Sequence, residues 1–311
     1  MEKTVAIIGG NGLVGGYLTR IFKGSQTYKK VVPTTHSIQK EGFYSLDITQ
    51  PAQLEEFFLN HRPDVVIFAA AMTHVDRCEK ERELCLKSNV EAVKDTVRFL
   101  KKLGKPFQLV FFSTEYIFDG EKGPYRENDP ANPLSVYGMS KWKAEEFIRG
   151  EVEDYLIARV TGVFGLEESG KNFFYTLGRH IVQKKTLKVP SDQISTPTYA
   201  GFIARAVRSL VESGKKGTFH VAAKNRIGRS EFAFAIARRF GWDAQWIQPV
   251  LTAELGQKAK RPLNAGLVPS VIPGIETMPT VEENLEKFYL EWKKWRYHEQ
   301  RSEQKCSSER N

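Results

Sequence analysis

A tyrosine and a lysine four residues apart could carry out acid–base chemistry in this chain. Tyr137 and Lys141 lie in a predicted helix over 135–149, and their spacing places both on one face. A free tyrosine has a pKa of about 10, and a neighbouring ammonium is expected to lower it. Lys141 can also reach the ribose of a bound nucleotide. Thr114 ends a predicted strand over 108–114, where its hydroxyl can hold a carbonyl beside Tyr137. The alternative is that these residues are a core aromatic, a surface lysine and a strand-end hydroxyl.

A glycine-rich loop near the N-terminus is a second candidate site. The segment GGNGLVG gives the spacing G-x-x-G-x-x-G directly after a predicted strand over 4–9 and opens a predicted helix over 13–23. Such glycines permit a tight turn, a close approach of backbone to pyrophosphate, and close helix–strand packing. The free N–H groups at the helix start then hold phosphates. We therefore expect a dinucleotide cofactor at Gly9, Gly12, Leu13, Val14 and Gly15. The alternative is a glycine-rich turn without a ligand.

The end of the second predicted strand, over 31–35, indicates which cofactor binds. Strand end and loop read Thr35, His36 and Ser37, with no carboxylate to accept from a ribose 2′-OH. A 2′-phosphate meets no like charge there, so NADPH is favoured, with NADH as the alternative. Asp47 and Ile48 follow the short run FYSL and are candidates for contacting the adenine. Alternatively, Asp47 is an N-cap or an Asx-turn residue before the next helix.

These residues must be positioned by alternating strands and helices. Further strands are predicted over 64–71 and 155–160, and a long helix over about 79–103 ends at Gly104 with Lys101 and Lys102 in its last turn. Strands that alternate with helices predict an α/β fold, a Rossmann-like doubly wound parallel sheet covered on both faces. A smaller C-terminal substrate lobe completes the fold.

The predicted division of the chain follows from this alternation. Residues 1–165 form the NADP-binding Rossmann domain, 166–300 are mainly the substrate lobe, and 301–311 are a polar, frayed tail. Strands near 186–190 and 217–223 are expected to return to the first domain. Helices are predicted near 171–184, 199–213, 229–240 and 280–299.

Composition excludes several classes of protein. The chain has 311 residues, 41% of them apolar and 27% charged, with no apolar run long enough for a membrane span and no signal peptide. The three cysteines lack metal-ligand spacing, which favours a reducing cytoplasm. The net charge of +9 fits either a solvated basic surface or anionic ligands. No nucleic-acid motif is present, so we expect a small-molecule substrate and neither nucleic acid nor membrane as a partner.

Several longer segments resemble one family. They are AAAMTHVDRCE (69–79), STEYIFDG (113–120), GPYRENDPANPLSVYGMSKWKAEE (123–146), RVTGVFG (159–165), DQISTPTYA (192–200), GTFHVAA (217–223) and RPLNAGL (261–267). Together with the glycine loop they resemble the extended short-chain dehydrogenase/reductases and, among these, the dTDP-4-dehydrorhamnose reductases. The resemblance runs from the glycine loop to about residue 270.

The resemblance implies roles for particular residues. Thr114, Tyr137 and Lys141 would be the catalytic triad, with Tyr137 and Lys141 also contacting the cofactor. Ala69, Ala70 and Ala71 would line the cofactor, and Asn89 would support the site. The substrate would be a nucleotide-linked 4-keto sugar, most simply dTDP-4-dehydro-L-rhamnose, held in the C-terminal lobe. The expected substrate contacts are Thr73, Val75, Thr114, Glu115, Tyr116, Gly162 and Arg261, the last with a surface ion pair as its alternative. A homodimer is a further expectation.

The chain departs from the family pattern at four positions. Glu115 stands where the family usually has Asp, and Ala265 where many reductases have Ser. Gly162 stands where a tryptophan is frequent, which leaves room for a bulkier sugar or for a neighbouring loop. Tyr17 stands where some members have a magnesium-binding Glu, so no metal is expected. The Asn264–Ala265 pair also resembles the regulatory subunit of methionine adenosyltransferase, so a non-catalytic NADP-binding subunit, or an enzyme for another nucleotide sugar, stays an alternative.

Overall fold

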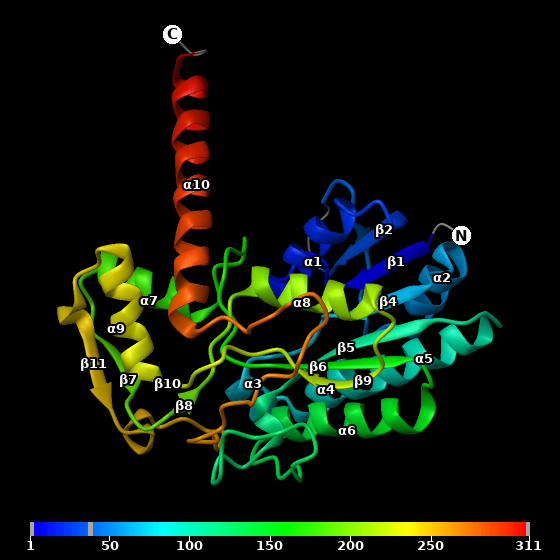
Figure 1. The fold of residues 1–311 in the computed structure, drawn as a ribbon, viewed down its shortest axis with the longest axis horizontal. Coiled ribbons are helices and arrows are strands. Elements are labelled where there is room, and N and C mark those ends of the chain that lie inside the picture. Colours follow the sequence, from blue (N-terminus) through cyan, green and yellow to red (C-terminus); the bar gives the residue numbers. More distant parts are fainter. Residues whose placement is uncertain (1–2, 37–39, 309–311) are drawn as a thin grey trace.

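A seven-stranded parallel sheet forms the centre of the computed structural model, which describes residues 3–36 and 40–308, with side chains through Tyr297. The strand order is β3-β2-β1-β4-β5-β6-β9 (Figure 1). The strands are β1 (Lys3–Ile8), β2 (Tyr28–Thr35), β3 (Tyr44–Ser45), β4 (Val65–Phe68), β5 (Gln108–Thr114), β6 (Tyr155–Val160) and β9 (Gly217–His220). The order reverses between β1 and β4, and in such sheets ligands bind in the crevice at that reversal.

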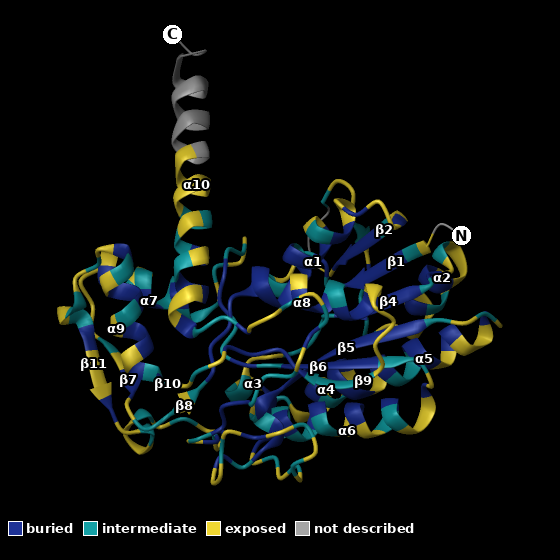
Figure 2. Cartoon of the chain, in the orientation of Figure 1, coloured by how far each residue is buried: buried dark blue, intermediate teal, exposed yellow. Residues whose placement is uncertain are grey.

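Helices cover both faces of the sheet, which confirms the doubly wound fold. On one face lie α1 (Leu13–Lys23) and α8 (Ala200–Glu212); on the other lie α2 (Pro51–His61), α5 (Ala92–Lys102) and α6 (Val136–Glu151) (Figure 1). The central strands are apolar and almost wholly buried (Figure 2). A near-continuous apolar strand is expected when both faces are covered.

A smaller lobe lies beyond β6. It contains α7 (Phe173–Val182), β7 (Leu187–Pro190), β8 (Ile194–Ser195), β10 (Ile227–Gly228), α9 (Arg229–Phe240), β11 (Ile247–Val250) and the 3₁₀ turns η3 (Ala244–Trp246) and η4 (Thr252–Leu255). The prediction that the strand near 186–190 returns to the main sheet is wrong, because β9 occupies the free edge of β6 and β7 pairs with β11 instead.

The long helix predicted over 79–103 is broken into shorter pieces. They are α3 (Val75–Lys80), α4 (Arg82–Leu86), the π-helical turn η1 (Lys87–Glu91) and α5. Glu81 interrupts the helix with φ −116° and ψ 55°, and the Nδ1 atom of His74 caps α3 by accepting from the Arg77 N–H at 3.2 Å. The helix end at Gly104 is as predicted, with Lys101 and Lys102 in the last turn.

The C-terminal helix α10 (Val281–Ser308) projects from the body (Figure 1). Leu285 and Phe288 are buried at its base, and the described residues further along are largely exposed (Figure 2). Residues 301–308, predicted as a frayed tail, continue this helix, because their Arg, Glu, Gln and Lys residues favour helix and no Gly or Pro interrupts them. Within the described part of the chain, no helix combines the length and the apolar character needed to cross a bilayer.

Candidate active site

The glycine loop joins β1 to α1 in the predicted strand–loop–helix arrangement. Gly12 is the N-cap of α1, and no side chain of the described residues caps the first N–H groups of that helix. A Cβ atom on Gly15 would lie 2.0 Å from the Gly9 carbonyl oxygen, so only glycine allows this packing. Leu13 and Val14, the first residues of α1, offer their backbone N–H groups to a ligand. The loop therefore fits a pyrophosphate, because a free helix N-terminus binds anions.

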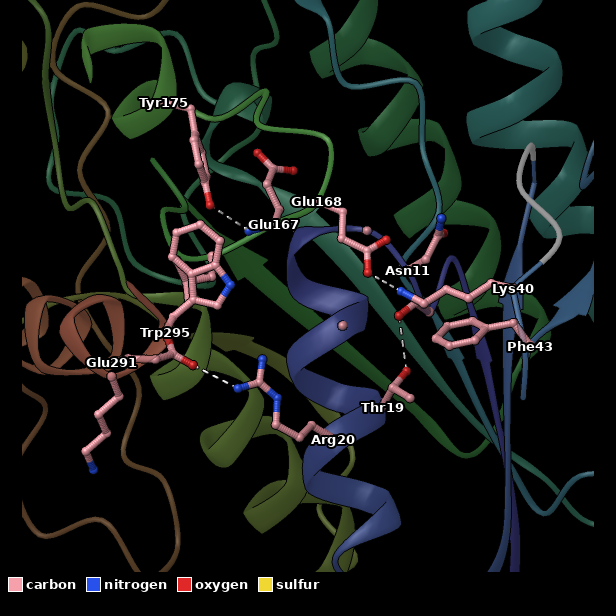
Figure 3. Close-up of a pocket in the computed structure, with 15 residues that line it drawn as sticks. Asn11, Thr19, Arg20, Lys40, Phe43, Glu167, Glu168, Tyr175, Glu291 and Trp295 are labelled. Carbon is pink, nitrogen blue, oxygen red and sulfur yellow. Dashed lines mark hydrogen bonds and ion pairs between the residues drawn. The ribbon is translucent and has the colours of Figure 1, made fainter. Parts of the chain in front are cut away.

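A pocket of about 710 Å³ opens beside this loop. Gly10, Asn11 and Gly12 form one part of its wall, and the opposite wall comes from the segments after β2 and β6 and from α10 (Figure 3). Lys40 forms an ion pair with Glu168 across the pocket. The cationic side chain of Lys40 is thus held next to the glycine loop.

The end of β2 and the segment after β3 lie near each other. Thr35 is buried and His36 is exposed, while Ser37 lies outside the described residues. The Asp47 carboxylate accepts hydrogen bonds from the N–H and hydroxyl of Thr49, at 2.9 and 2.8 Å, and lies 3.8 Å from the His36 ring. Asp47 therefore forms the Asx-type turn that was named above as its alternative role. Its neighbour Ile48 is partly buried against the core on the sheet face that α2, α5 and α6 cover. Contact of either residue with adenine stays a prediction.

The segment after β4 is fixed by Asn89, which lies in the π-helical turn. The side chain of Asn89 accepts from the Met72 N–H at 2.8 Å and donates to the Met72 carbonyl at 3.1 Å. It also donates to the Ser140 hydroxyl, which in turn donates to the Tyr137 carbonyl. Asn89 therefore connects the Ala69–Ala71 segment to the turn that carries Tyr137. Within that segment, the Cα of Ala70 lies against Gly9.

Thr114, Tyr137 and Lys141 come together at the ends of β5 and α6. Ser135 caps α6 by accepting from the Gly138 N–H at 3.2 Å, which places Tyr137 and Lys141 in the first turns. Thr114 ends β5 and accepts from the Tyr116 N–H, and it lowers the pKa of Tyr137 through a hydrogen bond. The Lys141 ammonium lies over the Phe111 ring, 3.9 Å from its centroid.

Burial dominates the acid–base properties of this group. It raises the pKa of Tyr137 more than the hydrogen bond with Thr114 lowers it. The net pKa of Tyr137 is therefore raised, and the expected lowering by Lys141 stays a prediction. Burial also lowers the pKa of Lys141 to about 7, although the Glu145 carboxylate opposes this shift. At neutral pH, Tyr137 is a protonated phenol that can donate a proton.

A buried ion-pair network lies directly behind Lys141, and the sequence analysis missed it. The Arg159 guanidinium binds the Glu145 carboxylate at 2.7 and 3.0 Å, and both side chains are almost wholly buried. Arg159 also donates to the Glu127 carbonyl and contacts the His220 ring. Glu145 follows Tyr137 and Lys141 at helical spacing on the same face of α6, so the spacing could have revealed it.

The predicted substrate residues lie next to this group. Glu115 and Tyr116 open the 3₁₀ turn η2 (Glu115–Ile117), and the Tyr116 ring packs against the Tyr137 ring with centroids 5.7 Å apart. Burial raises the pKa of Glu115 to about 8, while Thr161 and Arg229 oppose that shift. The Glu115 carboxyl is therefore mostly protonated at neutral pH.

A loop that contacts helix α3 brings Arg261 to the same region. Its guanidinium forms an ion pair with Asp76 of α3, with N–O distances of 2.7 and 3.2 Å, and also donates to the Ala259 carbonyl. The ion pair named above as the alternative for Arg261 is thus present in a half-buried form. Val75 begins α3, and Thr73 just before it is exposed.

Gly162 does not leave an open gap. It has φ +50°, which a side chain rarely adopts, and an added Cβ would lie 3.0 Å from Pro197. The segment that contains Pro197 has therefore filled the space beside residue 162. Gly162→Trp would strain the backbone, and contact of Gly162 itself with substrate stays a prediction.

Arg229 is a further residue of this region that the sequence did not indicate. It begins α9, and its charge acts on both Glu115 and Tyr116. More than one hundred residues separate Arg229 from Glu115, so no local spacing could have connected them.

No metal-ligand cluster occurs in residues 3–36 and 40–297, where side chains are described. Tyr17, the residue at the position where some family members have a Glu, donates a hydrogen bond to Glu291 of α10 and accepts one from the Leu166 N–H at 3.0 Å. The Tyr17 hydroxyl thus already has hydrogen-bond partners within the protein.

Comparison with known proteins identifies one family. The family model described as RmlD substrate binding domain matches residues 3–291. The spore coat polysaccharide biosynthesis protein SpsK of Bacillus subtilis is 35% identical, over 83% of this chain and 86% of that protein. The dTDP-4-dehydrorhamnose reductase of Burkholderia thailandensis is 30% identical, over 94% and 95%.

Solved structures agree with these matches. The dTDP-4-dehydrorhamnose reductase of Bacillus anthracis, crystallised with NADP, superposes with a TM-score of 0.83 and 29% identity, over 94% of this chain and 100% of that one. Methionine adenosyltransferase 2 subunit beta of Danio rerio is also similar, at 28% identity over 85% of this chain and 82% of that protein.

Proposed function

This chain belongs to the RmlD substrate-binding-domain family, and from that premise we propose that it reduces the 4-keto group of a nucleotide-activated deoxysugar with NADPH. The proposed reaction converts dTDP-4-dehydro-L-rhamnose to dTDP-L-rhamnose. The observation that carries the proposal is the convergence of Thr114, Tyr137 and Lys141 at the carboxyl end of β5. The glycine loop follows β1 at the same edge of the parallel sheet.

The chain's own residues account for binding, orientation and proton transfer. NADPH supplies the hydride when bound. The N-terminus of α1 holds its pyrophosphate, and Lys141 binds the ribose next to the nicotinamide. Thr114 orients the substrate carbonyl, and the protonated hydroxyl of Tyr137 donates its proton to the oxygen that becomes an alkoxide. The buried walls of the site exclude water from this transfer.

The proposal is tested by following the loss of NADPH absorbance with dTDP-4-dehydro-L-rhamnose and a panel of other nucleotide 4-keto sugars. We expect turnover with the dTDP sugar and formation of dTDP-L-rhamnose. If only a different sugar is turned over, the enzyme assignment stands and that sugar replaces dTDP-4-dehydro-L-rhamnose as the substrate. NADPH binding without turnover on any sugar would contradict the enzyme assignment.

A non-catalytic regulatory subunit is the second candidate function. The similarity to methionine adenosyltransferase 2 subunit beta and the Asn264–Ala265 pair favour it. The complete set of Thr114, Tyr137 and Lys141 in one group favours the enzyme. The homodimer and the cytoplasmic location expected from the sequence stay predictions, which sedimentation and cell fractionation would test.

A further inference from the structure

Arg229 lies where the smaller lobe meets the catalytic residues. It is the first residue of α9, and its backbone N–H donates to the Gln193 carbonyl at 2.8 Å. The guanidinium lies over the Phe173 ring at the start of α7, 3.8 Å from the ring centroid. Figure 1 shows α7 and α9 together in this lobe. The aromatic contact fixes the side chain without neutralising it.

Within the described residues, the Arg229 guanidinium has no anion at salt-bridge distance. Its guanidinium makes neither a salt bridge nor a hydrogen bond there, and burial lowers its pKa. The carboxyl group that acts on it is that of Glu115, whose pKa burial raises to about 8, so Glu115 offsets the charge of Arg229 only in part. A partly buried cation without a partner is costly, and a bound anion removes that cost.

The neighbouring arginine is already occupied. Arg261 has its charge balanced by Asp76 through two short contacts, whereas Arg229 faces the same residue, Tyr116, with its donors free. Guanidinium groups suit phosphate oxygens because their N–H donors match phosphate geometry. Of these two arginines, Arg229 is therefore the one that is available to bind a diphosphate.

We propose that Arg229 binds the diphosphate of the nucleotide-sugar substrate, an assignment that rests on the function proposed above. Arg229 enters the site from the smaller lobe, while Thr114 enters from β5 and Tyr137 from α6. Binding of the diphosphate would thus connect the lobe to the sheet across the substrate. Arg261 would support the position of Tyr116 and α3.

The test measures binding of dTDP and of thymidine by calorimetry, with the full chain saturated by NADP⁺ so that diphosphates cannot enter the cofactor site. Arg229→Met should weaken dTDP binding by about tenfold or more and leave thymidine and NADPH affinities unchanged. Arg229→Lys keeps the charge without the planar donors, so its loss of dTDP affinity should be smaller than that of Arg229→Met. Arg238→Met removes an exposed arginine of the same helix and should bind dTDP as the wild type does.

Thymidine binding separates this role from an internal one. If Arg229 serves the diphosphate, Arg229→Met loses affinity for dTDP alone; if it only orients Glu115 and the pocket around it, thymidine affinity falls by the same factor as dTDP affinity, and the inference is overturned. Equal dTDP binding by wild type and Arg229→Met also overturns it while the proposed function stands. If the wild-type protein binds no dTDP, both the proposed function and this inference are contradicted.

Discussion

Tyr137 is the residue whose chemistry the proposed function requires most directly. Burial keeps its phenol protonated at neutral pH by raising the pKa, so the group is ready to act as a general acid. Tyr137→Phe removes the proton donor and keeps the ring that packs against Tyr116. Turnover should fall by about 10²–10⁴-fold, with NADPH affinity little changed. Steady-state kinetics and fluorescence titration check this, and wild-type turnover in the variant would contradict the assigned role.

Lys40 provides a second prediction at the scale of single residues. Its ammonium lies beside the glycine loop, held by Glu168 (Figure 3), and no carboxylate follows the end of β2 directly. A 2′-phosphate at this place can take over from Glu168 as the partner of Lys40. Lys40→Met should therefore weaken NADPH binding by about tenfold, or ~1.4 kcal/mol, and leave NADH binding unchanged.

Matched variants distinguish this effect from a general loss of charge. Lys23 lies over the same Phe43 ring, with its ammonium 5.7 Å from the centroid, but does not line the pocket. Lys23→Met should leave both cofactor affinities unchanged. Glu168→Gln should tighten NADPH binding, because it releases Lys40. Equal losses for NADPH and NADH in Lys40→Met would rule out contact with the 2′-phosphate.

At the scale of elements, local patterns predict what lies within one strand–loop–helix unit. The spacing of Gly9, Gly12 and Gly15 and of Tyr137 and Lys141 is local, so both local arrangements could be predicted from sequence. The strand β7 has four residues, and its pairing with β11 depends on β9 occupying the edge of β6. Arg229 likewise reaches Glu115 through tertiary packing alone. Such features depend on long-range contacts that no short spacing records.

A buried ion pair links α6 to β6 behind the site. Glu145 of α6 is wholly buried and binds Arg159 of β6 and Arg149 of its own helix. Glu145→Gln leaves the Arg159 charge buried without its anion and should lower the free energy of unfolding by about 3–5 kcal/mol. Denaturant unfolding measures this. The Glu145→Gln/Arg159→Met double variant should be less destabilised than the sum of the single variants.

The same pair predicts a dependence on pH. Burial alone raises the pKa of Glu145, but the hydrogen bonds and charge of Arg159 outweigh it and hold the pKa below its ordinary value. The carboxylate therefore stabilises the fold fully above the unfolded-state pKa of about 4.3, and this contribution is lost as pH falls below it. The stability difference between wild type and Glu145→Gln should be constant near neutrality and shrink in acid. A difference that grows in acid would refute the assignment.

At the scale of the whole molecule, one carboxylate joins the two ends of the chain. Glu291 of α10 accepts hydrogen bonds from Tyr17 of α1, from Tyr199 at 2.7 Å and from Arg20 at 2.8 Å. Burial, followed by the nearby charges, raises the pKa of both tyrosines, so each stays a donor. This cluster holds α10 against α1. At the same place, α10 forms a wall of the pocket beside the glycine loop.

Removing the charge of Glu291 should therefore loosen the C-terminal helix. Glu291→Gln keeps the shape of the side chain but weakens its hydrogen bonds to Tyr17 and Tyr199. Hydrogen bonds to a charged group contribute about 1.5–3 kcal/mol, so Tm should fall by several degrees and proteases should cut α10 faster. Arg20→Met removes the exposed partner alone and should cost about 1 kcal/mol or less, because a solvent-exposed ion pair is weak. If Arg20→Met lowers Tm as much as Glu291→Gln, the surface ion pair rather than the two tyrosines anchors α10.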